Sequence, residues 1–233
     1  MNEYIIRPAT VNDISFLVRT IIEAEKSETD ILSYSTVFGL SNKYIRKYLK
    51  DILNEEIDGC ELSVSSFYVV DLDGKVVAAL SAWIEGVEGI SSALIKGNLL
   101  NYVLPKKCID RAIDLNNMIR ELHVDYIPMT IQIGACYVAK EYRGCGLIGS
   151  IIKFAINSLR NKYPDLSSVW VQVFNCNIPS LKAFKKNGFA EVYSKESLSK
   201  EIINYLPSSK KYILKKELKK QINGKIRTSR KTN

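Results

Sequence analysis

A strand, a glycine-bearing turn and an amphipathic helix follow one another between residues 129 and 159, and this order constrains the fold most. Residues 129–138 are rich in strand formers, and residues 147–159 carry apolar side chains at helical spacing. Gly144, Gly146 and Gly149 lie at the junction. A turn that opens a helix gathers backbone N–H groups at the positive end of the helix dipole, where a pyrophosphate binds well. The stretch therefore predicts an α/β chain with a phosphate-binding turn.

Two common nucleotide-binding motifs fit this turn poorly. A Walker P-loop ends in Gly-Lys-Ser/Thr, and no such ending is present. Gly144-x-Gly146-x-x-Gly149 has the letters of the dinucleotide-binding pattern, but it lies in mid-chain instead of after a first strand. A plain strand-to-helix turn without a ligand stays open on these residues alone.

The other periodicities predict one α/β domain with a mixed sheet. Thr10 and Asp13 form a capping signal before a first helix, and Asp73-Gly74 is typical of a hairpin turn. Strands are expected at 3–7, 66–71, 75–85, 129–138, 168–174, 189–193 and 211–218. Further helices are expected from about residue 41, at 147–159, at 179–186 and near 199–205, with a helical insertion at 86–126.

Charge and cysteine usage narrow the function classes. The net charge is +8, but residues 215–233 carry eight Lys or Arg and one Glu, so the rest of the chain is nearly neutral and a nucleic-acid partner is disfavoured. Five cysteines without a CxxC pair and one histidine predict free thiols, no metal and a reducing, cytoplasmic location. No apolar run is long enough for a membrane helix, and no signal peptide is expected.

Two motifs resemble those of the GNAT N-acetyltransferases. Val138-x-x-x-x-Arg143-Gly144-x-Gly146 resembles the family's acetyl-CoA signature, Q/R-x-x-G-x-G/A, although Ile148 stands where Gly or Ala is usual. About 30 residues later comes a stretch similar to the second motif, and the opening residues 5–10 are similar to family N-termini. The second motif is matched by Asn177, Ser180, Lys186, Gly188 and Phe189.

The resemblance implies a mostly antiparallel sheet with splayed central strands, spanning residues 1–217, and a basic tail at 218–233. It implies acetyl-CoA as cosubstrate. The backbone of Cys136, Tyr137 and Val138 would bind the pantetheine arm, and Asn177, Ser180 and Phe184 would complete that site. Asn177 is also a candidate helix cap near Pro179, and the two roles are compatible. The pyrophosphate would lie on the amides of Arg143, Gly144, Cys145, Gly146, Leu147, Ile148 and Gly149, with Lys182, Lys185 or Lys186 near the 3′-phosphate.

The implied reaction is direct attack of an amine on the thioester, and two departures leave the acid and the base unassigned. Phe184 replaces the tyrosine that is the general acid in many members, and Gln132 replaces a glutamate of the histone-modifying members. Glu85 or Glu88, at the end of the hairpin, is our hypothesis for the base, against the alternative of an exposed loop carboxylate. His123 is a weaker alternative base.

The expected activity is therefore N-acetylation of a primary amine of a small molecule. Three alternatives stay open: a peptide or protein N-acetyltransferase, a non-catalytic acyl-CoA sensor, and a nucleic-acid-binding protein acting through the tail. The insertion at 86–126 is expected to form a lid over the acceptor or the face of a homodimer.

Overall fold

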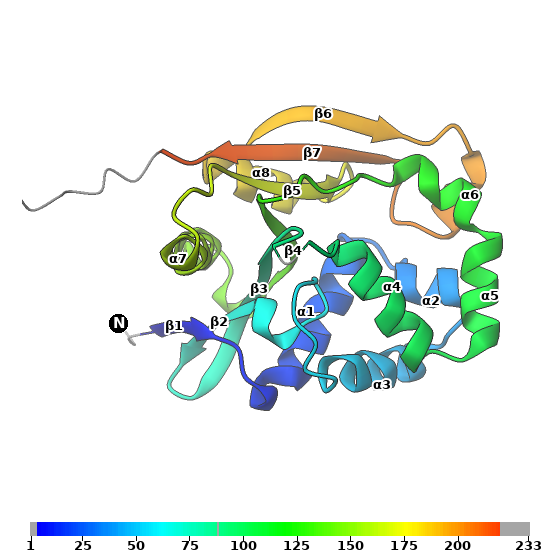
Figure 1. Ribbon diagram of the computed structural model, residues 1–233, viewed down its shortest axis with the longest axis horizontal. Helices are drawn as coiled ribbons and strands as arrows, with labels where there is room; N and C mark the ends of the chain where they lie inside the picture. The colour runs from blue at the N-terminus through cyan, green and yellow to red at the C-terminus, as the bar shows by residue number, and fades with distance from the viewer. Residues whose placement is uncertain (1–3, 88, 220–233) are drawn as a thin grey trace, which may run out of the picture.

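The computed structural model describes residues 4–87 and 89–219, and it contains a seven-stranded sheet in the order β1-β2-β3-β4-β5-β7-β6 (Figure 1). Neighbouring strands are antiparallel except β4 and β5, which are parallel. The mixed, mostly antiparallel sheet is therefore confirmed. The strands are β1 (Tyr4–Pro8), β2 (Phe67–Leu72), β3 (Lys75–Ile84), β4 (Ile131–Val138), β5 (Ser168–Phe174), β6 (Ala190–Glu196) and β7 (Lys210–Glu217).

Helices cover both faces of the sheet. The helices α7 and α8 pack on one face, and α1 lies on the other with the helices of the N-terminal region and the insertion (Figure 1). The helices are α1 (Ile14–Lys26), α2 (Ser33–Phe38), α3 (Asn42–Leu53), α4 (Ser92–Val103), α5 (Lys106–Asp114), α6 (Asn116–Ile119), α7 (Leu147–Lys162) and α8 (Ile178–Lys186). None of the helices in the described part of the chain is long and apolar enough to cross a membrane.

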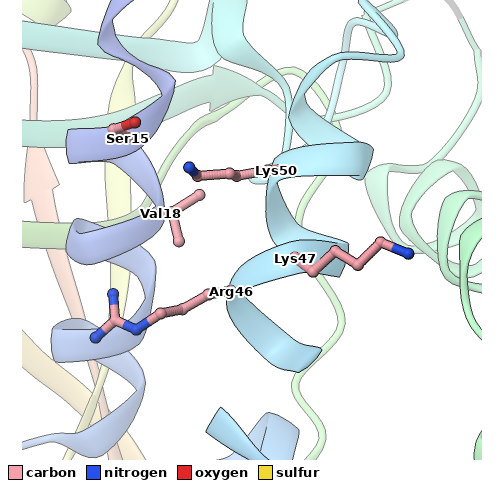
Figure 2. A pocket seen from close by; sticks show the side chains of 5 residues that line it. All are labelled: Ser15, Val18, Arg46, Lys47 and Lys50. Carbon is pink, nitrogen blue, oxygen red and sulfur yellow. The ribbon is translucent and has the colours of Figure 1, made fainter. Parts of the chain in front are cut away.

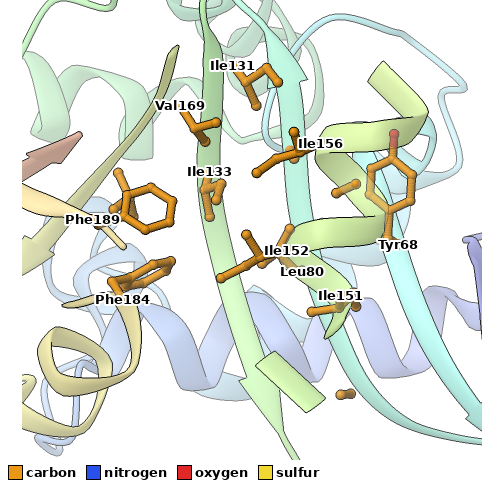
Figure 3. Close-up of a cluster of buried hydrophobic side chains, with 14 of the residues drawn as sticks. Tyr68, Leu80, Ile131, Ile133, Ile151, Ile152, Ile156, Val169, Phe184 and Phe189 are labelled. Atoms are coloured by element: carbon orange, nitrogen blue, oxygen red, sulfur yellow. The ribbon is translucent and has the colours of Figure 1, made fainter. Parts of the chain in front are cut away.

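The alternation of side chains along the strands builds two cores. Val70 and Ala78 belong to the core under α7 and α8, whereas their neighbours Val69 and Ala79 belong to the core under α1. Figure 3 shows the first core, in which Ile152 of α7 lies among side chains of the central strands. Because both faces are apolar, the central strands are fixed in register between two helical layers.

The central strands separate after a short paired stretch. The parallel ladder joins only Ile131–Ile133 of β4 to Val169–Val171 of β5, so the C-terminal half of β4 has no partner on that side. On its other side β4 pairs with β3, with a register shift near Gly134 and Ala135. A Cβ at Gly134 would lie 2.7 Å from Ser81 Oγ and 3.0 Å from the Trp83 ring, so glycine is required for this close approach.

The start of α1 is tied to the hairpin by charge. Asp13 accepts hydrogen bonds from the Thr10 amide at 2.8 Å and from Arg7 at 2.7 Å, and Arg7 also bridges to Asp71 at 3.0 Å. Burial alone would raise the pKa of Asp13, but the hydrogen bonds from Arg7 and Thr10 hold it below its usual value. The predicted capping signal is therefore confirmed and extended to a second carboxylate.

Three expectations need correction. The helix expected from about residue 41 is not the second but the third, because the six-residue α2 precedes it. The helix expected near 199–205 is a 3₁₀ turn at Lys200–Asn204, and the strand expected at 189–193 is β6, which extends to Glu196. The insertion is helical as predicted. Most of the expected basic tail, residues 220–233, lies outside the described residues.

Candidate active site

The turn after β4 presents a row of backbone N–H groups. Gly144 and Gly146 have φ angles of 83° and 77°, and nothing lies within 4 Å of where their Cβ atoms would be. Within the described chain, the amides of residues 144–148 have no protein acceptor, while Gly149 and Ser150 begin the bonding of α7. An open, glycine-bearing turn at the N-terminus of a 16-residue helix fits a pyrophosphate.

The departure at Ile148 leaves this turn open. Its side chain is half-buried and packs against the first core, so it points away from the row of amides. Gly149 lies close to the Asn187 side chain, since a Cβ there would be 2.6 Å from Asn187 Oδ1.

Arg143 lies between the turn and the free half of β4. Its Nε donates to the Val138 carbonyl at 3.2 Å, and its guanidinium is 3.8 Å from Glu28 and remains partly exposed. The side chain of Tyr137 is buried against Phe16. The expected pantetheine strand therefore offers its backbone, since the side chains of Tyr137 and Val138 are turned into the protein.

A cavity of about 610 Å³ opens where β4 and β5 separate. It brings together four of the predicted residues, namely Cys136, Asn177, Ser180 and Phe184. Asn177 Oδ1 accepts from the Ser180 amide at 3.1 Å, so Asn177 caps α8 at the edge of the cavity. Phe184 is 4 % exposed and packs edge-to-face on Phe189, with a centroid distance of 5.3 Å.

The α1 side of the same cavity carries two carboxylates and two ammonium groups that the sequence analysis missed. Glu25 comes from the end of α1, Glu61 from the loop before β2, Lys96 from α4 and Lys211 from the start of β7. The four positions are separated by 35 residues or more, so no local motif contains them. Only the fold identifies this cluster.

Glu61 and Lys96 neutralise one another. Lys96 Nζ donates to Glu61 Oε1, and the Tyr126 hydroxyl donates to Glu61 Oε2 at 3.3 Å. Burial alone would raise the pKa of Glu61, but Lys96 and Tyr126 hold it below its usual value. Glu61 is thus an ionised anchor whose two oxygens are both occupied.

Glu25 differs from Glu61 because it has no ion pair in the described part of the chain. Among the described residues no cation lies within ion-pair distance of it, and burial raises its pKa above the ordinary value for glutamate. Lys211 also lacks an ion pair in the described chain, and burial lowers its pKa. Its Nζ lies 4.8 Å from the centroid of the Phe174 ring.

Of the two carboxylates of our base hypothesis, only Glu85 is described by the structure, and it does not line the cavity. Glu85 is not the exposed loop carboxylate of the alternative reading: it is 3 % exposed and accepts from Trp83 Nε1 at 3.1 Å and from the Ser92 amide at 3.0 Å. These hydrogen bonds join β3 to the start of α4, and they favour a structural role for Glu85 over a catalytic one. Glu88 lies outside the described residues.

The other weighed residues have local partners. Gln132 is buried and donates to Thr130 Oγ1 at 2.7 Å. His123 is exposed at the rim of the cavity, 3.1 Å from Asp125. Within the described chain no cluster of His, Cys, Asp and Glu has an arrangement that would hold a metal ion.

A second hollow lies between α1 and α3 (Figure 2). Ser15 and Val18 line it from α1, and Arg46, Lys47 and Lys50 line it from α3. The three cations are exposed, and none of the predicted site residues is nearby. The cavity between β4 and β5 therefore remains the candidate active site.

A splayed β4–β5 pair, an open amide turn and a charged cavity together define a class of transferase that binds an acyl-CoA along a strand. The model of the acetyltransferase (GNAT) family matches residues 36–189. This chain thus belongs to the GNAT family and is an acetyl-CoA-dependent N-acetyltransferase. No curated protein matches it in sequence.

Solved structures share the fold at low sequence identity. An N-acetyltransferase from Staphylococcus aureus Mu50 has a TM-score of 0.61 at 15% identity, over 91% of this chain and 99% of that one. An agmatine N-acetyltransferase has 0.55 at 13%, over 92% and 99%. A ribosomal-protein-alanine N-acetyltransferase from Brucella melitensis has 0.50 at 15%, over 92% and 99%.

Proposed function

We propose that this enzyme acetylates a primary amine of a small molecule and that Glu25 is the general base. The observation that carries the proposal is that Glu25, a carboxylate with a raised pKa and without an ion pair among the described residues, lines the same cavity as Cys136 in the free half of β4. A base is most effective when its pKa lies near the working pH, and burial moves Glu25 in that direction.

In this proposal the chain's own groups hold acetyl-CoA. The backbone of Cys136, Tyr137 and Val138 binds the pantetheine arm as an added strand would, because this half of β4 has a free edge. The amides of residues 144–148 bind the pyrophosphate, whereas the amides of Arg143 and Gly149, also expected there, already donate to the carbonyls of Lys140 and Gly146. Asn177, Ser180 and Phe184 shape the wall next to the thioester.

The reaction we propose is a direct transfer. Glu25 removes a proton from the substrate ammonium, the freed nitrogen forms a bond to the acetyl carbon, and the carbon–sulfur bond breaks. The sulfur leaves with the electron pair of that bond and takes up a proton, and the nitrogen of the tetrahedral intermediate passes its second proton to water, which leaves the amide. Phe184 has no proton to give, so water in the cavity supplies the thiol proton.

Cys136 does not offer a covalent route. It lines the cavity, but burial raises its pKa to about 12, so the thiol stays protonated at neutral pH. A thiol is a poor nucleophile compared with its thiolate. Direct attack by the amine is therefore favoured over an acetyl-cysteine intermediate.

The size of the cavity supports a small acceptor. Its volume of about 610 Å³ must hold the thioester end of the cofactor as well as the amine. The insertion closes one side through Lys96, Leu100 and Ile119. The solved relatives include one named for agmatine and one named for a ribosomal protein, so the choice rests on the cavity.

The remaining assignments of our proposal concern domain and location. Residues 1–217 form the catalytic domain, since β7 ends at Glu217 and completes the sheet. The five cysteines are free, which fits a reducing compartment, and we place the enzyme in the cytoplasm.

The test of the base is Glu25→Gln. Removal of a general base costs about 10²- to 10⁴-fold in rate, so kcat/KM should fall at least 100-fold while acetyl-CoA still raises the melting temperature. Glu23→Gln is the matched control, because Glu23 is on the same helix and pairs with Lys26 at 3.7 Å, outside the cavity. Equal rates in the two variants would remove Glu25 from the mechanism.

A further inference from the structure

The cavity contains one balanced pair of charges and one separated pair. Glu61 and Lys96 form an ion pair, and Tyr126 completes it. Glu25 and Lys211 line the same cavity but are not within ion-pair distance of each other. The protein thus leaves one carboxylate and one ammonium facing a shared space.

The two groups come from different elements, and their charges attract one another without forming an ion pair. Glu25 is on α1, which packs against β4. Lys211 is on β7, on the far side of β5, where it lies over Phe174. The carboxylate is therefore carried by the helix that packs against β4, along which the acetyl group would arrive, and the ammonium by the strand that pairs with β5.

Charges without partners are costly in a partly dry cavity, and a ligand that supplies both counter-charges recovers that cost. A simple cationic amine would satisfy Glu25 but would also face Lys211 with a like charge. An amine that carries an anionic group would satisfy both. The ammonium group of Lys211 is a point charge and lacks the planar, bidentate fork of an arginine. A single carboxylate on the ligand is therefore enough to pair with it.

We propose that the acceptor is a zwitterion, an amino acid whose amine is held by Glu25 and whose carboxylate is held by Lys211. The inference rests on the proposed function, since it names the substrate class of that same cavity. Glu61 and Lys96 form an ion pair without net charge and do not bind the charged groups of the substrate in this proposal. Lys211 is a specificity-determining residue that touches the substrate but not the reacting bond.

The experiment compares matched acceptors. Each of a set of α-, β- and γ-amino acids is offered with acetyl-CoA, next to its methyl ester and its decarboxylated amine, and release of coenzyme A is followed. At least one amino acid should be acetylated with a kcat/KM at least about 30-fold above that of its ester and its amine, as expected when a desolvated charge loses its partner.

Three variants link the preference to Lys211. Lys211→Met should lower the ratio of kcat/KM between the amino acid and its decarboxylated amine at least about tenfold, and Lys211→Arg should retain most of it. Lys210→Met is the matched control, because Lys210 is the neighbouring residue, pairs with Glu196 at 3.1 Å and does not line the cavity. The melting temperature of each variant shows that it is folded.

Three results would overturn the proposal of a zwitterionic acceptor: preferential acetylation of the decarboxylated amines, acetylation of neither series, or an unchanged kcat/KM ratio in Lys211→Met.

The melting temperature with acetyl-CoA separates failure of this proposal from failure of the proposed function. If acetyl-CoA still stabilises the protein and cationic amines are acetylated, only the proposal of a zwitterionic acceptor is rejected. If acetyl-CoA gives no stabilisation, the proposed function falls with it.

Discussion

At the scale of single residues, Glu25 is placed where its charge opposes folding. Burial raises its pKa, which means that the folded state binds the Glu25 proton more tightly than the unfolded chain does. Stability is therefore lost as pH rises from the ordinary glutamate pKa, about 4.3, through the raised value. A loss of folding stability of this kind is expected of a group that is retained for a catalytic role.

This cost predicts a stabilising substitution. Glu25→Gln should raise the free energy of unfolding at pH 7 by about 1 kcal/mol, or about 2–4 °C in melting temperature for a chain of this size. The gain should vanish near pH 4, where the carboxyl is protonated in both states. Melting curves from pH 4 to 8 check it, with Glu23→Gln showing no such trend. A loss of stability at pH 7 would contradict the assignment.

The proposed cofactor-binding residues could be identified from the sequence, whereas the proposed base, Glu25, could not. Arg143, Gly146 and Asn177 lie in contiguous motifs and were predicted as cofactor contacts, and these roles remain proposals. Glu25 is one of several polar residues in α1, and the apolar spacing there predicts a helix without saying which polar side chain faces the cavity. Glu85 was chosen for its place at a strand end, and its burial could not be foreseen.

At the scale of elements, the periods of two and 3.6 residues predicted most of the sheet and the longer helices. The helix α2 was not predicted, because its six residues do not complete two helical turns and so show no clear period. The splaying of β4 from β5 came from the family resemblance, since their patterns alone do not state where pairing stops.

The bulged approach of β3 and β4 leaves no room for a side chain at Gly134. Gly134→Ala would place a methyl group against Ser81 and the Trp83 ring, so we expect a loss of about 1–3 kcal/mol. Gly97→Ala adds the same methyl in α4, where nothing lies within 4 Å, and should be neutral or stabilising. Thermal unfolding of both variants decides, and similar melting temperatures would show that β4 has room to move.

At the scale of the whole molecule, the cluster that we propose binds the acceptor is assembled from segments far apart in the sequence, at residues 25, 61, 96 and 211. Such a cluster depends on the topology that places α1, α4 and β7 around the gap between β4 and β5. Motifs could point to the proposed cofactor residues because these are neighbours in sequence, whereas no motif could point to the proposed acceptor residues, which are far apart in sequence.

Ligand-dependent stability follows from the same arrangement. Acetyl-CoA and free coenzyme A should each raise the melting temperature, whereas NAD should not. At 100 times the dissociation constant the gain is about 2.7 kcal/mol, or roughly 5–10 °C here. Differential scanning fluorimetry with the three ligands measures it, and an equal rise with NAD would show that the turn is not selective for coenzyme A.

The most direct test of the account is a mass balance on one reaction. The protein is incubated with acetyl-CoA and a pool of primary amines, and coenzyme A release and N-acetylated product are measured together. The account predicts equal amounts of both, formed only when an amine is present, and at least 100-fold less in Glu25→Gln. Release without an amine, acetyl found on Cys136, or full activity of Glu25→Gln would contradict it.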